Sequence, residues 1–129
     1  MAYPADYKYT KEHEWLKIEG NTGTVGITDY AQQQLGDIVF VELPKVGDAV
    51  TKGQTFGTVE SVKSVSDLYA PVSGKVTAVN EELTKSPEKI NSDAHGSWML
   101  RIEVSDPGDA STMLSAADYE KYVAEEGAK

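Results

Sequence analysis

Apolar and polar residues alternate along short stretches of this chain, and glycine and proline separate the stretches. Such alternation is typical of β-strands that bury one face. It predicts a hairpin formed by residues 15–19 and 24–27 around a turn at 20–23. The run at residues 38–43 is the most apolar and predicts a buried strand. Further short strands are expected at residues 49–50, 55–62, 64–69, 74–79 and 98–104.

Helical signals are few. Thr28 is a typical N-cap residue and Gly36 a typical helix terminator, so a helix of about two turns is expected between them. Ser86, followed by proline, predicts the cap of a single helical turn. A Ser-x-x-Asp sequence at Ser115 resembles a capping box. The expected helices are residues 29–35, the turn at 86–88, residues 109–114 and a C-terminal helix up to Gly127. The fold class is therefore predicted to be mostly β, with short helices and a C-terminal helix.

The sequence P-x-x-G occurs at residues 44–47 and again at 71–74, and each copy begins a predicted strand. Glycine at such turns permits positive φ angles. The stretch VESVKSVSD lies between the two copies, with Lys63 at its centre. This arrangement predicts two related β halves that meet at a hairpin with Lys63 at the tip.

Lys63 has two readings. The ordinary one is a solvated lysine on an amphipathic strand. The other is a lysine presented for covalent modification, because a hairpin tip is exposed and a modifying enzyme can close around it. An exposed lysine stays protonated, which argues against a Schiff-base nucleophile. Ser61 and Ser64 are small and leave room for such an enzyme, and Glu60 supplies a nearby charge for recognition.

The 129 residues suit one domain, and the net charge of −9 disfavours nucleic acid and anionic membranes as partners. The acidity fits docking on basic patches of other proteins, but on charge alone we favour a role in solubility. The absence of cysteine excludes disulfides and thiolate chemistry. The N-terminal segment has no signal-peptide pattern, so a location in the bacterial cytoplasm is expected. A monomer is also expected.

His13 and Glu14 begin an H-E-x-x-K sequence, which resembles the H-E-x-x-H zinc motif. Lys17 cannot replace the second histidine ligand, so no metal site is expected and a structural polar role is favoured for His13. The chain also has no nucleophile and base at a recognisable spacing, which predicts a protein that is not an enzyme.

The chain is similar to the glycine cleavage H-protein family of lipoyl carriers. The similar blocks are residues 9–15, 25–31, 35–44, 56–63 and 70–74, followed by Ser105-Asp106-Pro107. The related biotin carriers place methionine on both sides of the modified lysine, whereas Val62 and Ser64 stand there in this chain. The resemblance implies a single lipoyl-carrier domain over residues 1–129 with a barrel-sandwich hybrid fold. The chain departs from the family pattern at residues 91–98, where Ala94-His95 replaces Pro-Tyr and one residue is missing.

The resemblance implies that Lys63 carries lipoic acid through an amide bond. The implied partners are a pyridoxal-phosphate (PLP) glycine decarboxylase, a tetrahydrofolate-dependent aminomethyltransferase, a flavin (FAD) dihydrolipoyl dehydrogenase, and a lipoate ligase or lipoyl/octanoyl transferase. It also implies that Glu14 and Asp67 lie near the loaded arm, while Glu60 is expected to serve ligase recognition. A lipoyl relay that hands lipoate to other complexes and an unmodified interaction module remain alternatives.

Overall fold

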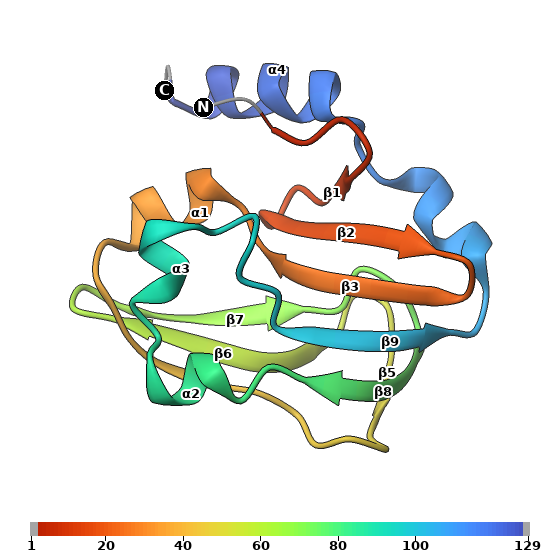
Figure 1. Ribbon diagram of the computed structural model, residues 1–129. Coiled ribbons are helices and arrows are strands. Elements are labelled where there is room, and N and C mark those ends of the chain that lie inside the picture. The colour runs from red at the N-terminus through yellow and green to blue at the C-terminus, as the bar shows by residue number, and fades with distance from the viewer. Residues whose placement is uncertain (1–2, 128–129) are drawn as a thin grey trace.

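The computed structural model describes residues 3–127, and their strands form two antiparallel sheets (Figure 1). The strands are β1 (Lys8–Tyr9), β2 (Glu14–Glu19), β3 (Thr22–Ile27), β4 (Ile38–Glu42), β5 (Ala49–Val50), β6 (Thr55–Ser61), β7 (Val65–Tyr69), β8 (Gly74–Val79) and β9 (Leu100–Val104). One sheet has the order β1-β2-β3-β9-β8-β5 and the other the order β4-β6-β7. The predicted mostly β class is confirmed.

The helices are short apart from the last one. They are α1 (Asp29–Leu35), α2 (Glu82–Lys85), α3 (Lys89–Ser92), the 3₁₀ helix η1 (Pro107–Thr112) and α4 (Ala116–Gly127). Figure 1 shows α1, α2 and α3 at one end of the sheets and α4 along the side that β1 and β2 occupy. None of the helices within residues 3–127 has the length and apolar character needed to cross a membrane.

The main core lies between the two sheets and takes side chains from both. Strand β9 shows the expected alternation, because Leu100, Ile102 and Val104 are buried while Arg101 and Glu103 are exposed. Burial of the alternate positions is what fixes the register of a strand with one solvated face. The strand predicted at residues 98–104 is thus present, and β9 occupies Leu100–Val104.

A second, aromatic cluster joins α4 to the first strands. Tyr9, Trp15 and Tyr119 are at most 2% exposed, and the rings of Tyr9 and Tyr119 stack with their centroids 4.8 Å apart. Strand β1 was not predicted, because two residues are too few to show alternation. Its place is fixed by antiparallel pairing with β2 and by backbone hydrogen bonds between Tyr9 and Leu114, at 2.9 and 2.8 Å.

The predicted buried strand at residues 38–43 is wrong at two positions. Val39 and Phe40 are 52% and 48% exposed, whereas Ile38 and Val41 are buried. The register between β4 and β6 shifts between Ile38 and Phe40, which marks a β-bulge. A bulge lets two consecutive side chains face the same side of a sheet. Hydrophobicity alone could not predict this local departure from alternation.

The helix predicted at residues 29–35 is confirmed, since the Ala31 N–H donates to the Thr28 hydroxyl at 3.2 Å and Gly36 has φ +79°. The predicted cap at Ser86 is wrong. Ser86 instead ends α2, and its N–H donates to the Glu82 carbonyl at 2.8 Å. The expected helix at 109–114 is the 3₁₀ helix η1, which begins earlier.

The two P-x-x-G glycines have different roles. Gly47 has φ +96°, as a tight turn requires. Gly74 does not adopt a positive φ; a Cβ atom there would lie 2.1 Å from the Glu103 carbonyl oxygen on β9. Gly74 is therefore required by close packing against β9. Of the two P-x-x-G turns, only the one at Gly47 has the predicted positive φ.

Candidate functional site

The predicted lysine hairpin is present, and Ser61 forms its turn. The Ser61 hydroxyl accepts hydrogen bonds from the N–H groups of Lys63 at 3.1 Å and Ser64 at 3.2 Å, and it donates to the Ser64 carbonyl at 3.3 Å. Ser61 is 7% exposed. A serine side chain that binds nearby backbone groups can replace the glycine or asparagine of commoner turns. Ser61 therefore shapes the turn and does not provide the open space that its small size suggested.

Lys63 is exposed at this tip, and its side chain lies over the C-terminal end of α1. A Cβ atom at Gly36 would be 3.3 Å from Lys63 Cε and 3.7 Å from its Nζ. The carbonyl end of a helix carries partial negative charge and attracts an ammonium group. The glycine that ends α1 therefore also makes room for the lysine stem.

A groove of about 140 Å³ lies between α1 and the β6–β7 pair. We call it the α1 groove. Its lining comes from α1, β6, β7, the end of β3 and the turn before β2: Glu12, His13, Ile27, Ala31, Gln34, Leu35, Val59, Ser66, Asp67 and Leu68. Leu35 directly precedes Gly36, so the groove lies next to the position that the Lys63 stem contacts. Asp67 is exposed and lines this groove.

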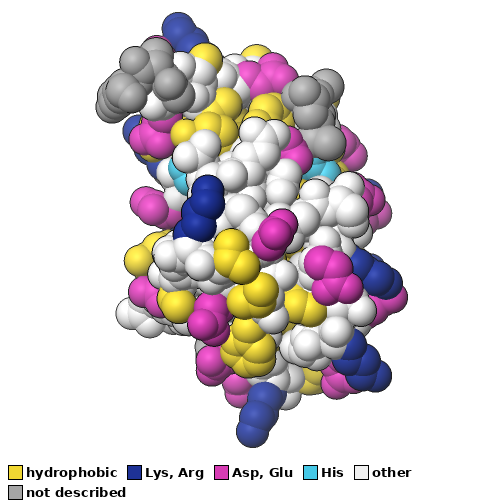
Figure 2. Space-filling view, turned by 90° about the vertical axis from the view of Figure 1, so that its left-hand side faces the viewer, with side chains coloured by type: hydrophobic (Ala, Val, Ile, Leu, Met, Phe, Trp, Pro, Cys, Tyr) yellow, Lys and Arg dark blue, Asp and Glu magenta, His cyan; other side chains and the backbone are white. Residues whose placement is uncertain are grey.

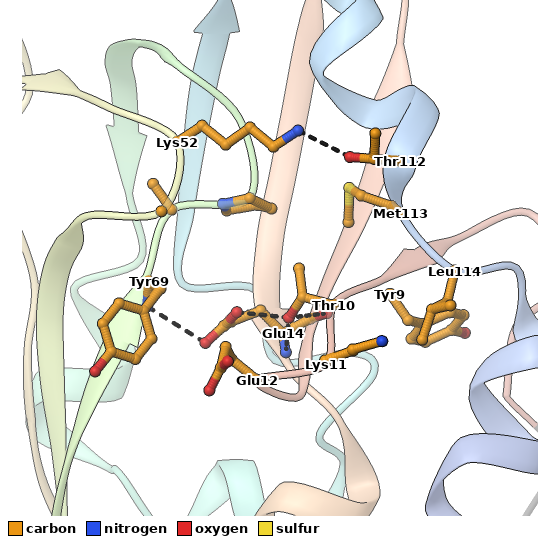
Figure 3. Close-up of a pocket in the computed structure, with 13 residues that line it drawn as sticks. Tyr9, Thr10, Lys11, Glu12, Glu14, Lys52, Tyr69, Thr112, Met113 and Leu114 are labelled. Carbon is orange, nitrogen blue, oxygen red and sulfur yellow. Dashed lines mark hydrogen bonds between the residues drawn. The ribbon is translucent and has the colours of Figure 1, made fainter.

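Glu14 faces a different space, a cavity of about 240 Å³ that we call the Glu14 cavity (Figure 3). Figure 3 shows the carboxylate between Thr10 and Tyr69, with Lys52 across the cavity. The Thr10 hydroxyl donates to Glu14 Oε1 at 2.6 Å, and the Tyr69 N–H donates to Oε2 at 3.3 Å. The side chain is 1% exposed. Burial raises the pKa of Glu14 to about 7, although these hydrogen bonds partly oppose the rise.

The structure thus places Glu14 and Asp67 in neighbouring spaces. Glu12 lines both the α1 groove and the Glu14 cavity, so it stands where the two approach each other. Glu12 was not predicted as a site residue from the sequence. Its position depends on the next residue, His13, whose φ of +72° is uncommon for a residue other than glycine. No local pattern in the sequence signals such a conformation.

His13 connects the groove to α4. Its Nδ1 lies 2.8 Å from the Tyr119 hydroxyl, which lies 2.7 Å from the Thr28 hydroxyl that caps α1. Burial lowers the pKa of His13. Within residues 3–127, no three His, Asp or Glu side chains are arranged to hold a metal ion. The first two residues of the H-E-x-x-K sequence therefore line different spaces: His13 lines the α1 groove and Glu14 lines the Glu14 cavity.

Glu60 lies on the outer face of the three-stranded sheet and is exposed. Its cross-strand partners are Phe40 on β4 and Val65 on β7. The carboxylate is therefore close to the tip but does not line the α1 groove.

The comparisons with known proteins agree with one another. The family model described as glycine cleavage H-protein matches residues 7–126. A glycine cleavage system H protein of Acidobacterium capsulatum is 68% identical over 126 residues, which are 98% of each chain. One from Carboxydothermus hydrogenoformans is 57% identical over 125 residues, 96% of each chain. The chain belongs to the glycine cleavage H-protein family.

The fold agrees with this membership. The crystal structure of a glycine cleavage system H protein from Mycobacterium marinum superposes with a TM-score of 0.85 at 38% identity, covering 97% of this chain and 99% of that chain. The resemblance read from the sequence blocks is therefore confirmed, as is the barrel-sandwich fold that it implied.

Residues 94 and 95, in the segment where we expect a departure from the family pattern, accept hydrogen bonds from the first part of the chain. The Ala94 carbonyl accepts from the Trp15 indole at 3.1 Å, and the His95 carbonyl accepts from the Tyr7 hydroxyl at 3.2 Å. His95 Nε2 also accepts the Asp29 N–H at 3.1 Å, at the first turn of α1. His95 therefore supports the helix that forms one wall of the groove.

Proposed function

We propose that this H-protein family member carries lipoic acid in amide linkage on Lys63. It would move the aminomethyl group of glycine from a PLP-dependent glycine decarboxylase to a tetrahydrofolate-dependent aminomethyltransferase. A dihydrolipoyl dehydrogenase that uses FAD would then restore the oxidised arm. The observation that carries this proposal is an exposed lysine at the tip of a hairpin in a chain with this family membership.

The residues at the tip fit the attachment of such a group. Lys63 is exposed, so a ligase or lipoyl/octanoyl transferase can reach its amine. The bonds of Ser61 hold the backbone on both sides of the lysine, which presents the amine in one place. The group when bound supplies a dithiolane on a long flexible stem, and the chain itself supplies no catalytic residue.

The α1 groove would shelter the loaded arm. Its floor and walls are largely apolar, through Ile27, Ala31, Leu35, Val59 and Leu68, and exclusion of water protects a hydrolysable group. The exposed carboxylate of Asp67 can accept a charge-assisted hydrogen bond from a cationic amine.

Glu14 would act deeper, beyond Glu12. A carboxyl whose pKa is about 7 is poised between its two forms near neutral pH. A cationic amine nearby favours the ionised form, and the ionised form in turn holds the amine. Burial thus makes the ionisation of Glu14 depend on the charge of a group that enters the Glu14 cavity.

The whole chain would act as one carrier domain, a monomer in the bacterial cytoplasm that does not bind nucleic acid or membranes. A lipoyl relay, which passes lipoate to other complexes, is the alternative because it uses the same lysine. Restoration of glycine decarboxylation by the three purified partner enzymes distinguishes the two, since a relay does not require that activity.

The test is Lys63→Arg, which keeps the positive charge at the tip but cannot form the lipoyl amide. The variant should fold normally and fail to support glycine decarboxylation in the reconstituted system. Lys75→Arg, at an exposed lysine on β8, is the matched control and should retain full activity. Normal activity of Lys63→Arg would exclude Lys63 as the site.

A further inference from the structure

Both tryptophans of the chain and its only arginine line one hollow on the outer face of the six-stranded sheet. The hollow has a volume of about 170 Å³, and we call it the Trp98 hollow. Its lining includes Tyr7, Trp15, Lys17, Thr24, Trp98 and Arg101. Tryptophan, tyrosine and arginine are the residue types that contribute most to binding at protein interfaces. Their convergence at one place therefore points to a surface that binds another molecule.

The aromatic floor of the hollow is held in one arrangement. Trp15 on β2 lies opposite Gly26 on β3, where a Cβ atom would approach the indole to 2.6 Å, so the ring lies against the neighbouring strand. The indole N–H donates to the Ala94 carbonyl at 3.1 Å, and the Tyr7 ring stacks on the indole with the centroids 4.7 Å apart. The Tyr7 hydroxyl donates to the His95 carbonyl at 3.2 Å. A surface that is ordered in advance loses little conformational entropy when a partner binds.

Two cations stand at the edge of this floor. Lys17, Thr24 and Arg101 form one cross-strand row, so the Cα atoms of the two cations are about 10 Å apart, which is two strand spacings. The Arg101 guanidinium carbon lies 4.3 Å from the centre of the Trp98 ring, and within residues 3–127 the group forms no ion pair. A guanidinium stacked on a ring keeps its N–H groups free to bind a carboxylate through two hydrogen bonds.

The charge of this hollow differs from that of the rest of the molecule. The net charge of the chain is −9, and Figure 2, which looks onto the end where β6 and β7 meet, shows acidic side chains scattered across that end. One carboxylate, Glu19, lies at the rim of the hollow with its Oε1 3.8 Å from Lys17 Nζ. Both side chains reach solvent, so this pair is weak and leaves Lys17 available. An aromatic hollow can also bind a cation, but Lys17 and Arg101 oppose that here.

The size of the hollow limits what can occupy it. Pockets for small molecules and cofactors usually have volumes of about 300–1,000 Å³. A hollow of about 170 Å³ is smaller and fits one inserted side chain. The aromatic floor suits a ring or a long apolar group, and the two cations suit carboxylates on either side of it.

We propose that the Trp98 hollow is a docking site for an acidic segment of a partner protein. The segment inserts one aromatic side chain over the floor and places carboxylates on Arg101 and Lys17. Lys63 lies at the end of the three-stranded sheet, so a segment bound on the six-stranded sheet leaves the lysine tip uncovered. The protein can therefore be held by one partner while another acts at Lys63. This inference goes beyond the proposed function and does not depend on it.

The experiment is an NMR titration of the ¹⁵N-labelled chain with a synthetic peptide, blocked at both ends, that has a central phenylalanine and two glutamates on each side. The two tryptophans both line the hollow, so both indole N–H signals report on it. The Trp98 signal should shift more, since Trp98 is partly exposed and Trp15 is buried. Peptides with glutamine or lysine in place of every glutamate are the matched controls.

The expected result is saturable binding of the acidic peptide that weakens as salt is added. Arg101→Gln should weaken binding about tenfold or more, and Arg101→Lys about threefold, because lysine keeps the charge and loses the paired hydrogen bonds. Lys17→Gln should weaken it about twofold to threefold. Lys75→Gln, at an exposed lysine on β8 outside the hollow, should bind as wild type, and so should Lys63→Arg.

Several results would overturn this inference. Indole signals that do not move at millimolar peptide would exclude docking, and wild-type affinity in Arg101→Gln would exclude the guanidinium as its anchor. Equal binding of the glutamine peptide, or tighter binding of the lysine peptide, would mean that the hollow does not recognise carboxylates. Equal shifts with free glutamate would assign the hollow to a small anion. Indole signals that depend on the concentration of the chain alone would assign it to a second copy.

Discussion

Glu14→Gln tests the reasoning about the buried carboxyl. Burial places the pKa of Glu14 at about 7 in the folded protein, against an ordinary value of 4.5. The difference of about 2.5 units corresponds to about 3 kcal/mol of differential stability between the two protonation states. The folded state binds this proton more tightly than the unfolded chain. The resulting stability is therefore fully present below pH 4.5 and is lost as the pH rises through about 7.

Glutamine cannot ionise, and it can keep both contacts. Its oxygen can accept the Tyr69 N–H, and its amide can donate to the Thr10 hydroxyl. The free energy of unfolding of Glu14→Gln should be close to that of wild type at pH 4.5. At pH 8.5 the variant should be more stable than wild type by about 3 kcal/mol.

The assay is urea unfolding followed by tryptophan fluorescence at pH 4.5, 6, 7 and 8.5. Subtracting wild type from variant at each pH cancels the other titrating groups. Glu103→Gln, at an exposed carboxylate on β9, is the control and should follow wild type throughout. A constant difference between Glu14→Gln and wild type across this range would refute the argument that burial controls this group.

Three further changes test the turn, the support of α1 and the groove. Ser61→Ala removes the hydroxyl that binds the turn, so unfolding free energy should fall by about 1–2 kcal/mol while the exposed Ser64→Ala stays near wild type. Burial lowers the pKa of His95, whose Nε2 accepts the Asp29 N–H, so the stability that neutral His95 contributes is lost as the pH falls below about 6.5. His95→Gln should therefore reduce the loss of stability between pH 7.5 and pH 5.0 by about 1 kcal/mol, as measured by thermal unfolding at both pH values. Asp67→Asn should hasten ammonia release from the aminomethyl-loaded protein by up to about fivefold, because an exposed ion pair contributes about 0.2–1 kcal/mol.

Different outcomes contradict each of these. Equal loss in Ser61→Ala and Ser64→Ala would mean that the hydroxyl of Ser61 does not hold the turn. A decline at acidic pH that persists unchanged in His95→Gln would assign it to His13 or to other groups. An unaltered rate of ammonia release would remove Asp67 from the protection of the arm.

The sequence predicted the parts of the fold that regular patterns encode. Strand β9 was readable because burial alternates along it, and α1 because Thr28 and Gly36 mark its ends. The exposure of Phe40 was not readable, since a bulge breaks the alternation and apolar composition favours burial. Ser86 was assigned to the wrong end of a helix, because serine followed by proline is compatible with both a start and a stop.

The candidate site divides in the same way. Lys63 could be placed at a hairpin tip from the strands around it, although the role of Ser61 in the turn emerged only from its hydrogen bonds. Glu14 and Asp67 entered through family resemblance alone. The position of Glu12 between the groove and the cavity depends on the positive φ of His13 and on contacts between residues far apart in the sequence, which no short motif records.

Intact mass spectrometry with peptide mapping, on protein expressed in cells supplied with lipoate, shows whether Lys63 carries the arm. We predict one lipoyl group per chain, located on the peptide that contains Lys63. An unmodified chain, isolated from cells whose other lipoyl proteins are fully loaded, would contradict the carrier function and favour an unmodified interaction module.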